Sequence, residues 1–281
     1  MKLVRYGEAG HEKPGLIDPQ GGIRDLSGAV RDIDGSAIGD EDLAKLRGLD
    51  VTTLPKVPGN PRLGIPVANV QKLICIGLNY SDHAKESNMP IPTEPVVFMK
   101  AVSALTGPND IVVLPKGSKK GDWEVELAFV IGKTARNVSE ANALDYVAGY
   151  TICNDVSERE WQLEHGSQWS KGKSFDTFAP VGPCLVTRDE IADPHNLAMW
   201  LEVNGKRMQT GNTNTMIFGV PKLLSYLSYF VTLMPGDIVS TGTPPGVGMG
   251  IKPKPVFLKS GDSMRLGIDG LGEQKQSVTG G

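Results

Sequence analysis

The sequence has few aromatic residues, few cysteines and no long apolar run. Aromatic side chains make up 6% of the 281 residues, whereas glycine (34) and proline (20) are plentiful. This composition favours a strand-rich protein with many tight turns over a helical bundle. No apolar run approaches the roughly 18 residues of a membrane span, and the N-terminus lacks the charged-then-apolar pattern of a secretion signal. We therefore expect a soluble, cytoplasmic protein.

An excess of charge of either sign is also missing. The net charge is -3 and charged residues make up 22% of the chain, which argues against a nucleic-acid or anionic-membrane partner. A small molecule is the expected ligand. The cysteines, Cys75, Cys153 and Cys184, are odd in number and lie far apart in apolar runs, so we expect reduced, buried thiols and no disulfide.

The first 66 residues differ in character from the rest. Short alternating segments at 2–6, 14–18 and 22–26 predict strands, and residues 38–48 predict a short helix that Gly48 ends. A linker rich in proline follows at 54–61. We expect a small N-terminal β-domain over residues 1–66, packed on or completing a main domain over residues 67–281.

The main domain shows strand patterns joined by turns and a few helices. Asn204-Gly205 predicts the type I′ turn of a hairpin over 198–209. The segment 88–95 holds three prolines and is interpreted as a loop free to act as a lid, and the tail beyond Gly272 is expected to be loose. The other predicted elements are strands at 72–77, 96–100, 121–132, 149–155 and 238–241, helices at 138–148 and 221–230, and a closing hairpin at 258–268.

Two glutamates stand two residues apart in the strand at 121–132. Side chains alternate across a strand, so Glu124 and Glu126 must point to one face, while Val125, Leu127 and Phe129 point to the other. Neighbouring carboxylates repel unless a proton or a cation lies between them, and carboxylates around water-filled space are how proteins hold Mg²⁺. Taken alone, such a pair is equally typical of a solvated polar face.

Two further patterns combine acidic residues with other polar groups. His83 and Glu86 are three apart on a short helical turn, where a carboxylate would orient an imidazole as a base for water. Asp155 ends a strand, and Arg159 and Gln162 follow it at i+4 and i+7, on one stripe of a predicted helix. The alternative for His83 and Glu86 is an exposed polar helix. The alternative for Asp155 and Arg159 is a capping aspartate with a surface ion pair.

Two lysines and a glycine-rich loop complete the set of candidate site residues. Lys100 ends a strand and either binds an anionic substrate or is exposed. Lys173 precedes an aromatic segment, where it either lies along the surface or stabilises developing negative charge. The loop at 242–248 would place backbone amides and the Thr243 hydroxyl beside an anion, but it lacks the lysine of a phosphate-binding loop.

Taken as an ordered set, these motifs resemble the fumarylacetoacetate hydrolase family from about residue 70 to the end. The resemblance implies a strand-rich α+β protein with a mixed β-roll, a small N-terminal domain and a homodimer. It implies one divalent cation, Mg²⁺ or alternatively Mn²⁺, held by Glu124, Glu126 and Asp155. The matching motifs are Asn79-Tyr-Ser-Asp-His83 with Glu86, Glu124-x-Glu126, Asp155 with Arg159 and Gln162, Lys173-Ser-Phe-Asp, and Thr241 to Gly248.

The resemblance also implies an enzyme acting on 2-oxo or 2,4-dioxo acids by hydrolysis, decarboxylation or isomerisation. We expect hydrolysis, because His83 with Glu86 would activate a water that an isomerisation does not need. The preferred substrate is a 2,4-diketo-3-deoxy sugar acid of the fuconate or rhamnonate type, giving pyruvate and a hydroxy acid such as lactate. The residues implied are His83, Glu86 and Lys173 for catalysis and Tyr80, Lys100, Arg159, Gln162 and Thr243 for substrate binding.

Other activities stay open on the same residues. They are an isomerase of the 2-hydroxyhepta-2,4-diene-1,7-dioate type, a decarboxylase of the oxaloacetate type, a fumarylpyruvate hydrolase, and a non-catalytic module with a structural Ca²⁺ site.

Overall fold

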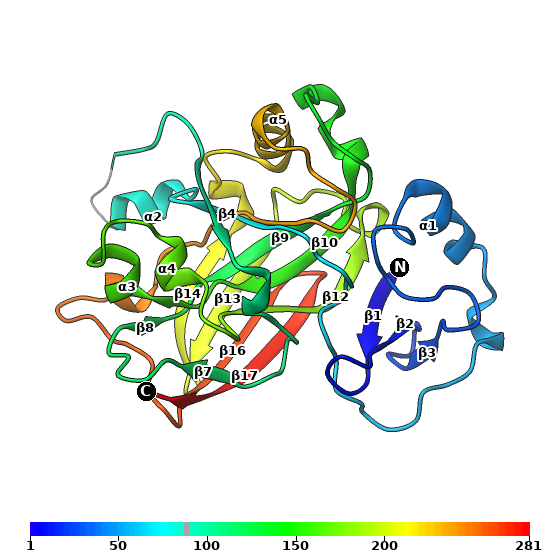
Figure 1. Ribbon diagram of the computed structural model, residues 1–281, viewed down its shortest axis with the longest axis horizontal. Helices are drawn as coiled ribbons and strands as arrows, with labels where there is room; N and C mark the ends of the chain where they lie inside the picture. The colour runs from blue at the N-terminus through cyan, green and yellow to red at the C-terminus, as the bar shows by residue number, and fades with distance from the viewer. Residues whose placement is uncertain (87–89) are drawn as a thin grey trace.

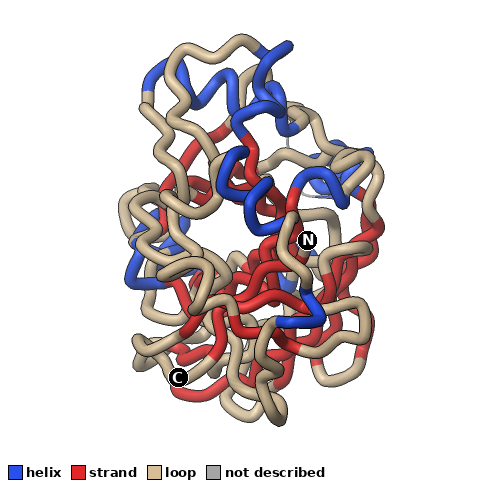
Figure 2. Tube along the Cα trace, turned by 90° about the vertical axis from the view of Figure 1, so that its right-hand side faces the viewer, coloured by secondary structure: helices blue, strands red, loops and turns tan. Residues whose placement is uncertain are grey.

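The computed structural model describes residues 1–86 and 90–281, and it confirms the strand-rich α+β class. Figure 2 shows strands through the centre of the molecule with most helices around its periphery. The largest sheet is mixed and has ten strands. These are β1 (Lys2–Tyr6), β2 (Lys13–Ile17), β3 (Ile23–Asp25), β4 (Leu73–Gly77), β5 (Val96–Lys100), β6 (Leu105–Thr106), β9 (Val125–Ile131), β10 (Val147–Asn154), β12 (Ala179–Thr187) and β15 (Ile238–Ser240).

A second sheet of five strands packs on the first. Their shared core brings Val125, Leu127 and Phe129 of β9 together with Leu201 and Leu266 of the second sheet. The five strands are β7 (Val112–Leu114), β13 (Ala198–Val203), β14 (Lys206–Asn212), β16 (Ser263–Ile268) and β17 (Gly272–Gly280), and a separate two-stranded ribbon pairs β8 (Gly121–Asp122) with β11 (Ser157–Glu158).

The helices are short, and no described helix has the length and hydropathy needed to cross a membrane. The longest, α5, buries Leu223, Leu224 and Leu227, as its apolar spacing predicts. The α-helices are α1 (Asp40–Arg47), α2 (Ser81–Glu86), α3 (Arg159–Leu163), α4 (Ser170–Lys173) and α5 (Val220–Phe230). The 3₁₀-helices are η1 (Val51–Thr53), η2 (Val102–Ala104), η3 (Glu140–Tyr146), η4 (Arg188–Glu190), η5 (Thr213–Thr215) and η6 (Gly248–Gly250).

The N-terminal strands complete the main sheet. Figure 1 shows this segment, in blue, at one side of the molecule together with α1. Strand β1 pairs with β12, so β1 to β3 extend the sheet that also contains β9 and β10. The strands of residues 2–25 therefore belong to the main sheet, and the domain boundary at residue 66 stays a prediction.

Two expected elements are corrected. Residues 138–148 were expected to be helical throughout, but only Glu140–Tyr146 form a 3₁₀-helix, and Val147 already begins β10. The tail beyond Gly272 is not loose, because it forms β17 between β16 and β7. Its buried side chains include two glutamines, and the Gln274 amide donates to the carbonyls of Ile152 and Gly182, each at 2.9 Å.

The buried amide of Gln274 generates a stability prediction. We expect Gln274→Ala to lower the free energy of unfolding by about 1–3 kcal/mol, because it leaves buried carbonyls of β10 and β12 without their donor. The neighbouring Lys275 is exposed on the same strand, so Lys275→Ala should change stability by less than about 0.5 kcal/mol. Urea unfolding of both variants measures the difference, and equal effects would contradict a structural role for this tail.

Candidate active site and metal centre

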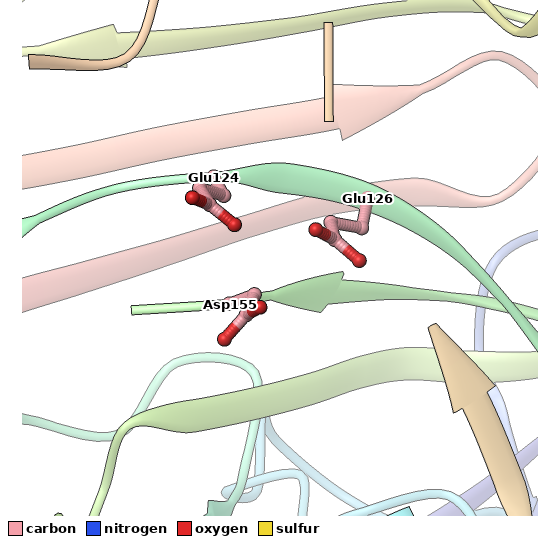
Figure 3. Close-up of side chains that lie close together, drawn as sticks. All are labelled: Glu124, Glu126 and Asp155. Atoms are coloured by element: carbon pink, nitrogen blue, oxygen red, sulfur yellow. The ribbon is translucent and has the colours of Figure 1, made fainter. Parts of the chain in front are cut away.

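Three acidic side chains meet where β9 and β10 lie side by side. The antiparallel register pairs Glu126 with Cys153 and Val125 with Asn154, so Asp155 follows β10 directly beside Glu124. The Asp155 amide donates to the Glu124 carbonyl at 2.9 Å. Figure 3 shows the three carboxyl groups gathered between the two strands, and one oxygen of each lies within 4.8 Å of the others. The structure thus brings together the three residues expected to bind a metal.

Asp155 does not share a helical stripe with Arg159 and Gln162, which corrects the expected arrangement. Residues Ser157–Glu158 form β11, and α3 begins only at Arg159. The Glu158 side chain accepts from the Trp161 amide at 3.0 Å and caps this helix. Asp155 therefore reaches the site from β10, whereas Arg159 and Gln162 reach it from α3.

Three buried cations neutralise part of this acidic cluster. The Lys173 ammonium lies 2.8 Å from Glu124 Oε2 and 2.7 Å from Asp155 Oδ2. Arg159 Nη2 lies 2.7 Å from Glu124 Oε1, and its Nη1 donates to Gln162 Oε1 at 3.0 Å. Lys100 is neither exposed nor in contact with the cavity, because its ammonium binds the Asp155 carboxylate and the Val156 carbonyl. Its position makes it a support for Asp155.

A fourth buried carboxylate, Asp122, was missed in the sequence. Asp122 Oδ2 accepts from Arg159 Nε at 2.8 Å and from the Met249 amide at 3.0 Å, and Oδ1 accepts from the Gly248 amide at 2.6 Å. It thereby joins α3 to the glycine-rich loop. The signal was present, since acidic residues at 122, 124 and 126 repeat with the period of a strand.

The buried carboxylates outnumber the buried cations. Glu126 has no cationic partner among the described residues, and its Oε2 accepts from the Ser240 hydroxyl at 2.6 Å and from the Gly242 amide at 2.9 Å. Burial, with the charges of Asp155 and Glu124, raises the pKa of Glu126 well above its usual range. Burial acts in the same direction on Glu124, but Lys173 and Arg159 outweigh it and lower the pKa of that carboxyl to about 2. With all four carboxyl groups ionised, one negative charge would be left over, and the raised pKa of Glu126 reflects the cost of that charge.

This donor set fits a hard divalent cation. Oxygen ligands of an octahedral Mg²⁺ are about 3 Å apart when adjacent and about 4.2 Å apart when opposite, so three carboxylates within 4.8 Å of one another can share one cation once their side chains move closer together. All three donors are carboxylate oxygens, which Mg²⁺ and Mn²⁺ favour over soft ligands. A bound cation would stabilise the ionised form of Glu126, which burial and the neighbouring carboxylates disfavour.

His83 and Glu86 form a fixed pair on α2. Glu86 Oε2 lies 3.0 Å from His83 Nδ1, and Glu86 Oε1 accepts from the Gly246 amide at 3.1 Å. His83 is buried and lines the same cavity as Glu124, so the alternative of an exposed polar helix is wrong for this residue. A hydrogen on Nδ1, held by Glu86, leaves Nε2 as the acceptor. The lid expected at 88–95 includes residues that lie outside the described ranges.

Thr243 and Tyr80 do not offer a free hydroxyl hydrogen to a substrate. Thr243 Oγ1 donates to the Val125 carbonyl at 2.8 Å and accepts from Gln209 Nε2 at 2.8 Å. Gln209 is a buried residue that the sequence analysis missed. The Tyr80 hydroxyl lies 3.3 Å from Met199 Sδ inside the core. Both residues therefore support the site from behind, although Thr243 also lines the cavity.

The charged cluster opens into a cavity of about 240 Å³. This is smaller than the roughly 300–1,000 Å³ of pockets for drug-sized ligands, so a small substrate is expected. Its charged lining is Glu124, Glu126, Lys173, Arg159 and His83, with Gln162 beside them. A larger hollow of about 500 Å³ beside α1 has none of these residues.

Comparison with known proteins agrees with the resemblance. Residues 72–279 match the family described as fumarylacetoacetate (FAA) hydrolase C-terminal. A relative from Burkholderia ambifaria, named no more specifically than a hydrolase, is 63% identical over 99% of each chain. The crystal structure of maleylpyruvate hydrolase from Sphingobium sp. SYK-6 with manganese (II) ion and pyruvate is 32% identical, with a TM-score of 0.83 over 100% of each chain.

A third relative has a different type of activity in its name. The structure of 2-hydroxyhepta-2,4-diene-1,7-dioate isomerase from Mycobacterium marinum is 31% identical, with a TM-score of 0.74 over 100% of this chain and 98% of that one. The chain therefore matches both a hydrolase and an isomerase in fold and in sequence. The chain belongs to the fumarylacetoacetate hydrolase family of enzymes.

Proposed function

We propose that this protein is a divalent-metal-dependent hydrolase that cleaves a C–C bond in a small 2,4-dioxo acid and releases pyruvate. The proposal depends on the convergence of Glu124, Glu126 and Asp155, of which Glu126 has no cationic partner among the described residues, beside the His83–Glu86 pair. The manganese and pyruvate in the maleylpyruvate hydrolase structure support the same chemistry. The resemblance also implies a homodimer.

The protein's own charges would polarise the substrate. A divalent cation on the three carboxylates, Mg²⁺ or Mn²⁺, would act as a Lewis acid toward the oxo acid. Arg159 is held by Asp122, Glu124 and Gln162, so its guanidinium keeps a fixed orientation beside the cavity. Burial acts to lower the pKa of Lys173, but Asp155 and Glu124 outweigh it and raise that pKa, so Lys173 keeps its charge and can stabilise negative charge on the departing pyruvate.

His83 would supply the water chemistry. Its Nε2 would take a proton from water as the oxygen attacks the carbonyl carbon of the acyl group. The bond between that carbon and C3 of the pyruvate unit then breaks, and the proton passes to C3. The products are pyruvate and the acid of the acyl group, so all atoms of substrate and water are accounted for.

The substrate screen decides between the related activities. A panel of 2,4-dioxo acids, including fumarylpyruvate and a 2,4-diketo-3-deoxy sugar acid, should release pyruvate, which lactate dehydrogenase measures. Conversion of a dienoate without pyruvate release would identify an isomerase, and loss of CO₂ from oxaloacetate would identify a decarboxylase. Either result without pyruvate release from any 2,4-dioxo acid would refute the proposed reaction.

Metal removal should abolish the activity. We expect a chelator to lower the rate of pyruvate release by at least about 100-fold, and added Mg²⁺ or Mn²⁺ to restore it. Glu126→Gln should lower Mn²⁺ affinity in calorimetry, because it removes the carboxylate that lacks a cationic partner. Glu273 is exposed on β17, so Glu273→Gln serves as the matched control and should bind Mn²⁺ normally. Full activity in the chelator would contradict a metal-dependent reaction.

Removal of the His83 imidazole should lower the reaction rate and leave metal binding unchanged. We expect His83→Ala to reduce kcat by about 10²–10⁴-fold, because general base catalysis contributes about that much, while Mn²⁺ affinity stays unchanged. His11 is exposed in the N-terminal segment, and His11→Ala should retain the wild-type rate. If His83→Ala keeps full turnover while Glu126→Gln loses it, the role assigned to His83 is wrong.

A further inference from the structure

The cavity has a charged inner end and an apolar outer end. Glu126, at the inner end, is almost completely buried, whereas Leu163 and Met249 are 43% and 38% exposed and line the same space. Their greater exposure therefore places Leu163 and Met249 at the mouth of the cavity. The remaining apolar lining residues are Ile76, Leu78, Phe98, Trp169 and Val247.

Leu163 and Met249 are large apolar side chains that the fold leaves uncovered. They come from unrelated elements, the end of α3 and η6, and still face one cavity. The Met249 backbone is fixed, since its amide donates to Asp122 Oδ2 at 3.0 Å. Exposed apolar side chains that converge on a polar-rimmed hollow are typical of a ligand-binding surface.

Trp169 forms a rigid wall of this outer end. A Cβ atom on Gly77 would lie 2.4 Å from Trp169 Cζ3, so the ring packs directly on a backbone that only glycine allows. The Trp169 ring also meets Phe98 edge to face, with centroids 5.5 Å apart. A wall built from close aromatic packing keeps its shape when a ligand leaves.

No cation in the described lining is free to bind a second carboxylate. Arg159 is bound by Asp122, Glu124 and Gln162, and Lys173 is bound by Glu124 and Asp155. The imidazole of His83 already contacts Glu86. A carboxylate at the outer end would lose part of its water against apolar side chains without gaining an ionic partner, which is unfavourable.

We infer that the outer end of the cavity binds an uncharged, apolar acyl group. The preferred substrate is then a 2,4-dioxo acid with an alkyl or aryl acyl group, and substrates with a second carboxylate, such as fumarylpyruvate, are disfavoured. Leu163, Trp169 and Met249 determine this specificity. The inference rests on the proposed function for the oxo-acid end only, and its test measures binding without turnover.

Two oxo acids that differ at one end test the inference. 2-Oxoheptanoate and 2-oxoheptanedioate share the same chain, which ends in a methyl group or in a carboxylate. In calorimetry with Mg²⁺ present, we expect 2-oxoheptanoate to bind at least about tenfold more tightly. Equal or tighter binding of the dicarboxylate, or no binding of either acid, would overturn the inference. Discrimination between the acids in a protein that hydrolyses no 2,4-dioxo acid would instead refute the proposed reaction alone.

A charge placed at the mouth should reverse part of the preference. We expect Leu163→Lys to tighten 2-oxoheptanedioate binding about fivefold relative to 2-oxoheptanoate, the upper end for a solvent-exposed ion pair. Leu144 in η3 is the matched control, since it is 41% exposed and does not line the cavity. Leu144→Lys should leave the ratio unchanged. An unchanged ratio in Leu163→Lys, or the same shift in both variants, would show that the mouth does not select the acyl group.

Discussion

An excess of buried carboxyl groups over buried cations, at the adjacent ends of β9 and β10, is the constraint on which the rest of the site depends. Carboxylates removed from water repel one another, and the protein offsets this with cations from three separate elements, Lys100 on β5, Arg159 on α3 and Lys173 on α4. Glu126 accepts from a hydroxyl and an amide, which do not fully stabilise its ionised form, so its pKa stays above its usual range. Such an arrangement is costly in an isolated protein, and a bound dication would offset that cost.

The polar residues around this cluster divide into those that face the cavity and those that hold them in place. Lys100 fixes Asp155 from behind, and Asp122 fixes both Arg159 and the loop that carries Met249. Gln209 fixes Thr243 and accepts from the Val125 amide, so it ties the glycine-rich loop to β9. The precision of the site therefore depends on buried side chains that never meet the substrate.

The sequence predicted the local geometry of the site better than its long-range contacts. Alternation along one strand placed Glu124 and Glu126 on one face, and Asn204 and Gly205 have the positive φ angles of 50° and 74° that their turn requires. The position of Asp155 beside Glu124 and Glu126 could not be derived in this way, because it depends on the pairing of β9 with β10. Only the family resemblance predicted it. The helical stripe was wrong because Ser157 and Glu158 pair with β8 before α3 begins.

Buried polar residues account for two further errors, in the C-terminal tail and at Lys100. The tail with Gln274 and Gln276 looked like a solvated end because its side chains are polar, yet both amides are buried and bind carbonyls of distant segments. Whether Lys100 is exposed could not be predicted for the same reason, since its partner Asp155 lies 55 residues away in the chain. A local pattern shows that a residue is polar, but it cannot show whether the fold later supplies a partner that permits burial.

The separation of charged and apolar residues in the cavity explains how one scaffold can serve different substrates. Glu124, Glu126 and Asp155 are fixed by the register of a central sheet, and a change there would disturb both faces of β9. Leu163 and Met249 lie at the end of a short helix and in a loop, so a new side chain at either position alters the mouth without moving a strand. The acidic end can therefore stay constant while the apolar mouth varies, which agrees with the presence of both a hydrolase and an isomerase among the relatives.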